Sequence, residues 1–384
     1  MNKYLFILGL VGAAMLTACS SDDLTPVLSP DEERALVVEA GMDSDIPITL
    51  SSMGCMRSGM TRTPIESDAN DLFETPSGQY LGVSCLARGK QVDAPSYIGD
   101  DVRWSAAYAT SYPYANWMTN KPAIVKNDGT IEFRKEEDLS AEKKWYYPFG
   151  NWYQYDFYAY YPRQASVSTI AKSSSVIINI DGRQDIIWGK ASSDDEVTDL
   201  VTNTNVKAYS SKYLRLTGNK PQFGFEHKLT QFVFYVKPHD TSVTQLQTDG
   251  IKVTDMKMKE VYKKLKLIIA SKDANLTEGK ISELSEYGDL NLWNGVTDAF
   301  SGGAIPVVSA SYDSDDESTH KTYIGYAMVP PSALITGKGH SQFKVYILLK
   351  DNTDATYKKI TKVLDPPASG YLAGHKYEIV LDIY

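Results

Sequence analysis

Histidine, cysteine and surplus positive charge are all scarce in this chain of 384 residues. It has five His and three Cys, and its 39 Lys and Arg stand against 48 Asp and Glu, a net charge of −9. Without a basic surplus to neutralise phosphates, binding to nucleic acid has little support. Three Cys cannot form a disulfide framework, and so few His and Cys leave little for metal chemistry. These scarcities favour packing and surface contact over acid–base catalysis.

The local motifs of well-known enzyme classes are also missing. The sequence has no H-E-x-x-H, no G-x-S-x-G, no P-loop and no G-x-G-x-x-G, and no two His have the i,i+4 spacing of metal ligands. The acidic run at 313–317 lacks the central Gly of an EF-hand loop, so we interpret it as a solvated loop. We therefore expect no enzyme activity, no cofactor and no bound metal.

Two of the three cysteines have two possible states. Cys55 and Cys85 are compatible with a disulfide in an oxidising cell envelope, and equally with two small buried thiols.

The first 19 residues have the form of an export signal. Lys3 is followed by an apolar stretch over 5–15 that is too short to span a bilayer as a stable helix. Leu16-Thr17-Ala18-Cys19 then matches the lipobox of bacterial lipoproteins. This predicts a signal peptide over 1–18 and acyl chains on Cys19 that hold the protein to the outer membrane.

The segment after the lipobox predicts a surface location. Residues 20–23 read Ser-Ser-Asp-Asp, which resembles the surface-export signal of some Gram-negative anaerobes. Residues 19–45 show no sustained strand period, and we predict a lipidated flexible linker there.

The rest of the chain is rich in alternation of apolar and polar residues, the pattern of half-buried strands. The alternating apolar positions are Ile46, Ile48 and Leu50; Val176, Ile178 and Ile180; Phe343, Val345, Ile347 and Leu349; and Tyr377, Ile379, Leu381 and Ile383. Residues 351–354 fit a hairpin loop. The stretch 261–269 fits a strand or a short helix, with Lys alternation favouring the strand, and 196–201 is predicted as one short helix. The pattern predicts an all-β fold of antiparallel sheets.

A domain boundary is predicted near 215–222, where Gly218 and Pro221 interrupt the alternation. The division gives an N-terminal β-sandwich domain over 46–217 and a C-terminal β-sandwich domain over 218–384.

Aromatic residues are abundant: 26 Tyr, 11 Phe and 6 Trp. They are densest at 152–162, where Tyr155, Phe157 and Tyr161 would share one strand face and Tyr158 and Tyr160 the other. A strip of rings for stacking on sugars is one interpretation. We favour the other, a core strand covered on both faces, which Pro162 ends because it has no N–H to donate.

Five segments in order resemble the fimbrillin family, surface lipoproteins of Gram-negative anaerobes. They are FYAYYP at 157–162, DIIWG at 185–189, FGFEHKLTQFVF at 223–234, AMVPP at 327–331 and GHKYEIVL at 374–381. The resemblance implies two transthyretin-like antiparallel β-sandwich domains in tandem. It implies a structural fimbrial (pilus) subunit or an associated adhesin, with other fimbrial subunits and host or bacterial surface receptors as partners. The role that it implies for His227 is structural.

The same resemblance implies assembly by donor-strand exchange after cleavage by an Arg-specific protease. A strand around 46–50 would be the removable one, with Arg62 and then Arg57 as candidate processing sites just after it. Cutting at Arg34 would leave that strand in place. The last strand, 371–384, is then either the donor or part of a tip, anchor or non-polymerising relative. The alternative from a different class is a non-polymerising surface lipoprotein that binds glycans through Trp and Tyr rings.

Overall fold

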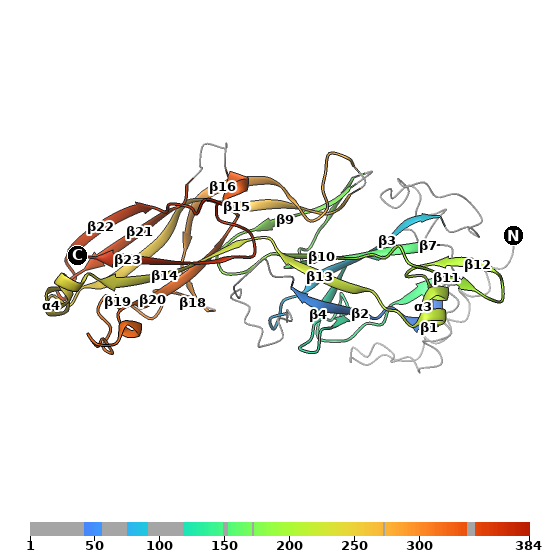
Figure 1. The fold of residues 1–384 in the computed structure, drawn as a ribbon, viewed down its shortest axis with the longest axis horizontal. Coiled ribbons are helices and arrows are strands. Elements are labelled where there is room, and N and C mark those ends of the chain that lie inside the picture. Colours follow the sequence, from blue (N-terminus) through green and yellow to red (C-terminus); the bar gives the residue numbers. More distant parts are fainter. Residues whose placement is uncertain are drawn as a thin grey trace, which may run out of the picture.

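A computed structural model of the chain describes residues 42–55, 75–90, 118–148, 153–170, 173–271, 273–295, 297–335 and 342–384. The protein is mostly β, with 52% strand and 8% helix, in agreement with the all-β expectation. Figure 1 shows an elongated molecule with two β units end to end: the barrel unit on the right and the sandwich unit on the left, where the chain ends. None of the helices in these residues is long and apolar enough to cross a bilayer.

The barrel unit is a sheet that closes on itself. Its strands in hydrogen-bonding order are β10 (Ile187–Ala191), β13 (Gln222–His227), β2 (Leu50–Cys55), β5 (Thr130–Phe133), β4 (Met118–Val125), β3 (Leu81–Lys90) and β7 (Tyr153–Tyr161), with β7 returning to β10. All pairs are antiparallel except β13 with β2, which is parallel. Closure removes the sheet edges and encloses one apolar core.

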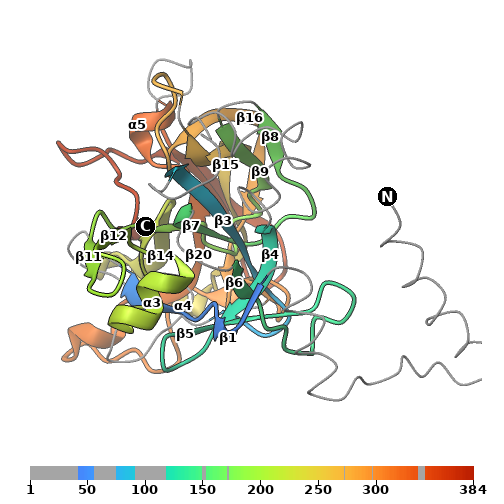
Figure 2. The same ribbon diagram turned by 90° about the vertical axis from the view of Figure 1, so that its right-hand side faces the viewer.

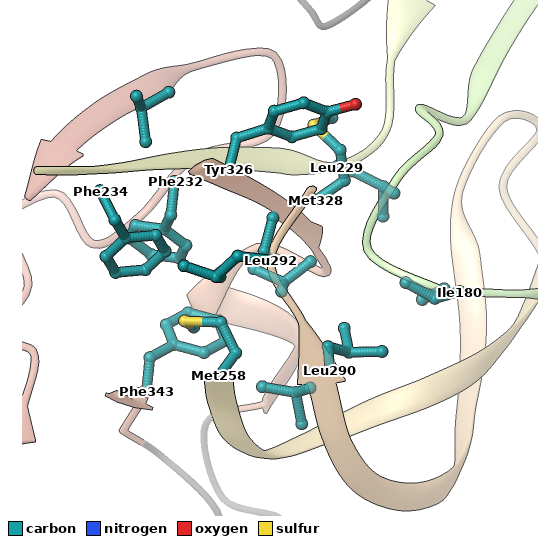
Figure 3. Packing of buried hydrophobic residues seen from close by; sticks show 14 of the residues in the cluster. Ile180, Leu229, Phe232, Phe234, Met258, Leu290, Leu292, Tyr326, Met328 and Phe343 are labelled. Carbon is teal, nitrogen blue, oxygen red and sulfur yellow. The ribbon is translucent and has the colours of Figure 1, made fainter. Parts of the chain in front are cut away.

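The sandwich unit is built from two sheets. The first has the order β18 (Thr297–Asp298), β17 (Trp293–Asn294), β20 (Thr322–Val329), β14 (Thr230–Pro238) and β23 (Lys376–Ile383). The second has the order β22 (Thr356–Val363), β21 (Lys344–Lys350), β15 (Lys252–Ser271), β9 (Ser173–Asn179) and β8 (Ser168–Ile170), with β16 (Ile281–Asn291) and β19 (Ile305–Pro306) also on β15. Figure 3 shows Phe232, Met258 and Phe343 meeting between these sheets.

Smaller elements surround the two units. Strands β1 (Met42–Pro47) and β6 (Tyr146–Pro148) form one small sheet, and β11 (Glu196–Asp199) and β12 (Thr204–Lys207) form a hairpin. The helices of the described residues are α3 (Ser211–Thr217), α4 (Val243–Thr248) and α5 (Ser332–Ile335), with 3₁₀ turns η3 (Asp240–Ser242) and η4 (Glu317–Thr319). Strand β1 begins inside the segment expected as linker.

The chain passes between the units three times, so the sheets do not divide at one point of the sequence. It leaves the barrel after β7 for β8 and β9, returns to the barrel at β10, and leaves again between β13 and β14. Strands β8 and β9 therefore lie in the sandwich unit although they precede the predicted boundary at 217/218, and β13 lies in the barrel although it follows it. The transthyretin-like detail of the two domains stays a prediction.

A loop of the sandwich is fastened to the outside of the barrel. One Glu278 carboxylate oxygen accepts from the Tyr158 hydroxyl at 2.8 Å and the other accepts from Lys190 Nζ at 2.8 Å. Trp188 donates its Nε1–H to the Ile269 carbonyl at 2.8 Å. Gly279 lies so close to this indole, at φ +71°, that a Cβ there would be 2.5 Å from a Trp188 ring carbon. The two units thus share a packed and hydrogen-bonded junction.

Most of the expected strands are confirmed, and one expected helix is wrong. The alternating stretches at 176–180, 343–349 and 377–383 fall almost entirely in β9, β21 and β23, and 261–269 belongs to strand β15. Residues 196–199, predicted as helix, form β11 because Val197 and Thr198 pair across the hairpin with Val206 and Asn205.

Candidate strand-exchange site

Strand β2 closes the barrel between two neighbours. It runs parallel to β13, with Phe223 opposite Ser52, and antiparallel to β5, with Ile131 opposite Leu50. The side chains of Ile48 and Leu50 are only 5% and 2% exposed and belong to the barrel core. Removing this segment would leave unpaired edges on β13 and β5 and uncover that core.

The strand expected at 46–50 is divided in the structure. β1 ends at Pro47 and β2 begins at Leu50, and between them the Ile48 N–H donates to the Trp145 carbonyl at 2.7 Å. Pro47 has no N–H for a continuous ladder, which accounts for the change of partner. The inserted segment is therefore β1, a crossover at Ile48 and Thr49, and β2.

A cavity of about 350 Å³ lies beside this crossover. Its lining includes Ile48, Ile131 and Phe133 on the apolar side, and Glu132 and Glu142 on the polar side. The crossover is thus open to solvent on one flank, while the Leu50 side chain is enclosed.

The candidate processing sites lie just beyond the end of β2. Arg57 and Arg62 are outside the described residues, as are Arg34 and the candidate lipidation residue Cys19. Their roles stay predictions. Strand β2 ends at Cys55, two positions before Arg57, so a cut at either Arg would separate β1 and β2 from the rest of the chain.

The C-terminal strand β23 sits at the edge of its own sheet. It runs parallel to β14 from Lys376, opposite Gln231, to Ile383, opposite Pro238. Tyr377, Ile379 and Leu381 face the sandwich core but are only half-buried. Its outer edge has no strand beside it among the described residues. Strand β22 ends the other sheet and carries exposed Lys358, Lys359 and Lys362, which oppose further strand pairing.

The aromatic strand β7 is core, as favoured from the sequence. Tyr155, Phe157 and Tyr161 point into the barrel core, and Tyr158 and Tyr160 pack into the sandwich core; all five are at most 2% exposed. The Tyr160 hydroxyl donates to Asn120 Oδ1 at 2.8 Å, and burial raises the pKa of Tyr160 to about 12. These rings are not available for stacking on sugars.

The three tryptophans in the described part of the chain offer little free ring surface. Trp188 is buried, a Lys143 ammonium lies 5.8 Å from the Trp145 ring, and the Arg183 guanidinium lies 5.2 Å from the Trp293 ring. Tyr235 and Tyr323 form an aromatic pair with ring centroids 5.7 Å apart, in which Tyr323 is exposed and Tyr235 is half-buried.

His227 and Cys85 have structural surroundings. The His227 ring contacts the fully buried Asp185 carboxylate, whose other oxygen accepts from the Ile186 N–H at 2.7 Å. These contacts agree with the structural role expected for His227. Cys85 is a free, buried thiol whose pKa is raised by burial and by Asp156, so it stays protonated and unreactive. No three His, Cys, Asp or Glu side chains in the described part of the chain are arranged to hold a metal ion.

Comparison with known proteins gives likenesses of structure. No family model matches the sequence, and no curated protein matches it. A candidate cell adhesion protein from Bacteroides uniformis is 13% identical, with 88% of this chain and 93% of that chain covered and a TM-score of 0.44. A fimbrial protein from Bacteroides ovatus is 12% identical, with 88% and 50% covered and a TM-score of 0.30.

The fimbrial anchor protein Mfa2 from Porphyromonas gingivalis is 8% identical, with 82% of this chain and 81% of that chain covered and a TM-score of 0.29. The solved structures that this chain resembles thus include fimbrial and adhesion proteins, the kinds of protein that the sequence resemblance names.

Proposed function

We propose that this protein is a structural fimbrial subunit or a fimbria-associated adhesin, exported as a surface-exposed outer-membrane lipoprotein through Cys19. Its partners are other fimbrial subunits. The observation that carries the proposal is the position of β2, which closes the barrel and ends two positions before Arg57. Its fold, on this proposal, is the tandem of transthyretin-like domains.

Cleavage at Arg62 or Arg57 would open the barrel for a strand from another subunit. The free edges of β13 and β5 would offer main-chain hydrogen bonds, and the places of Ile48 and Leu50 would become pockets. An apolar side chain that fills such a pocket contributes about 1.5–3 kcal/mol on full burial. Strand β23 is a candidate donor because Tyr377, Ile379, Leu381 and Ile383 alternate in the same way.

Proteolysis of the purified protein, prepared without its lipid, tests the strand-exchange step. An Arg-specific protease should give a ladder of oligomers on unheated gels, with new N-termini at Ser58 or Thr63. Arg57→Ala combined with Arg62→Ala should abolish the ladder, whereas Arg34→Ala should preserve it. A protein that is cleaved at these sites and stays monomeric would refute the proposal.

A surface glycan-binding lipoprotein is the second candidate function, favoured by the exposed ring of Tyr323 beside half-buried Tyr235. The Lys321 ammonium lies 4.4 Å from the Tyr235 ring centroid, beside the Tyr323 ring, which is 39% exposed. Affinity gels with embedded polysaccharide distinguish this candidate. Retardation of a stable monomer, lost in Tyr323→Ala, would favour it over the fimbrial role.

A further inference from the structure

The β11–β12 hairpin ends in two apolar residues that stand out in solvent. Leu200 and Val201 are 91% and 93% exposed. The other exposed large apolar side chains in the described part of the chain are between 36% and 58% exposed. Two adjacent side chains with almost no protein contact are unusual, because surface apolar groups normally rest against their neighbours.

The turn that carries them is held firmly. The Asp199 carboxylate accepts from the Val201 N–H at 2.9 Å, from the Thr202 hydroxyl at 2.6 Å and from Lys212 Nζ at 2.6 Å. Asp199 is itself buried, and Asn203 closes the turn at φ +50°. These contacts fix the backbone of the tip, so Leu200 and Val201 are held pointing away from the protein.

The hairpin lies at the pole where the N-terminal segment enters the fold. Figure 1 places β11 and β12 at the barrel end beside α3 and β1, and Figure 2 looks onto that end. Arg215 of α3 lies 3.7 Å from Asp45 of β1. Strand β1 begins at Met42, 23 residues after Cys19, so a lipid on Cys19 can lie at most about 80 Å from this pole.

We propose that Leu200 and Val201 insert into the lipid surface to which the protein is anchored, and so set the direction in which the rod stands. This inference rests on the proposed lipid attachment at Cys19. The acyl chains supply the retention, and the hairpin tip supplies a second contact on the same pole. Orientation follows because a single attachment point leaves the rod free to tilt, whereas two attachment points do not.

A lipid surface fits the tip better than a second copy of this chain does. The tip is convex, and hydrocarbon adapts to any convex shape. In a second copy, the apolar cavity beside Ile48 is also lined by Glu132, Glu142 and Lys143, whose hydration would be lost. The charges near the tip are paired, with Lys207 on Glu196 at 2.7 Å and Lys212 on Asp199, so anionic lipid is not required.

Fluorescent labelling of the full-length lipidated protein in phosphatidylcholine vesicles tests this inference. Val201→Cys and Val380→Cys each carry an environment-sensitive NBD label, with the parent protein treated alike as background. Val380 is the matched control because it is an exposed valine on the distant sandwich sheet. On vesicle binding we expect a several-fold rise in emission at position 201, quenched by brominated lipid, and no change at position 380.

The outcomes separate the tip from the anchor. Unchanged emission at position 201, in protein that sediments with the vesicles, overturns the inference and leaves the anchor intact. Protein that fails to sediment refutes the lipid anchor, and the inference with it. Emission at position 201 that rises with protein concentration without vesicles would assign the tip to a second copy, which also overturns it.

Discussion

Strands β2 and β23 each pair in parallel with a neighbouring strand, but they differ in how many neighbours they have and in how deeply their side chains are buried. Each runs parallel to one of two consecutive strands, β2 beside β13 and β23 beside β14. Strand β2 has a neighbour on both sides and encloses Leu50, whereas β23 has one neighbour among the described strands and half-buried Ile379. The number of residues that a strand pairs with its neighbours therefore does not indicate how much of the core the strand covers. The short β2 closes a core, and the longer β23 extends a sheet.

The largest effect should come from truncating the buried side chain of β2. Leu50→Ala leaves a cavity in the barrel core and should lower the free energy of unfolding by about 2–5 kcal/mol. Urea denaturation followed by circular dichroism measures it. Ser51→Ala, on the same strand at a half-exposed position, serves as the control and should change little. A loss below about 1 kcal/mol for Leu50→Ala would mean that β2 does not hold the barrel closed.

An intermediate effect on stability should come from ionising Tyr160 at high pH, where the two units meet. Tyr160 belongs to the barrel strand β7 but packs in the sandwich core, and its pKa is raised to about 12. The unfolded chain loses this proton near pH 10. The contribution of Tyr160 to the free energy of unfolding is therefore fully present below pH 10 and falls as the pH rises toward 12. The expected loss from Tyr160 is about 2–3 kcal/mol.

Tyr160→Phe isolates this contribution. The variant should lose less stability than the parent between pH 10 and 12, in denaturant titrations at each pH. Equal slopes in the two proteins would show that ionisation of Tyr160 does not contribute to the loss of stability in alkali.

The smallest effect should come from the edge strand. Ile379→Ala should cost about 1 kcal/mol, since this side chain is half-buried and its surroundings can relax toward solvent. The exposed neighbour Val380→Ala gives the baseline in the same denaturation assay. A cost for Ile379→Ala as large as that of Leu50→Ala would remove the distinction between the two strands.

The sequence predicted local structure well where burial alternates. Tyr377, Ile379, Leu381 and Ile383 marked β23 because every second residue faces the core, and the aromatic run at 157–161 marked β7 as a strand covered on both faces. The hairpin at 196–207 was missed because its charged and polar residues carry no such alternation, and its turn depends on the Asp199 contact with distant Lys212.

Alternation of apolar and polar residues does not predict which distant strands pair with each other. Nothing in the sequence 222–227 indicates that it pairs with 50–55, or that 173–179 joins a sheet with 264–271. Because of these pairings, the first unit closes into a barrel. Strands β8 and β9 lie in the sandwich unit, and β13 lies in the barrel. The candidate strand at 46–50 was located correctly in the core, but Pro47 divides it between two sheets.

The triple passage of the chain between the units bears on how the molecule responds to tension. A pull applied between the two poles is divided among three covalent backbone segments, after β7, before β10 and between β13 and β14. The two units cannot be separated by extending one linker, as two domains joined by a single linker can. Separating the two units must instead extend all three segments together.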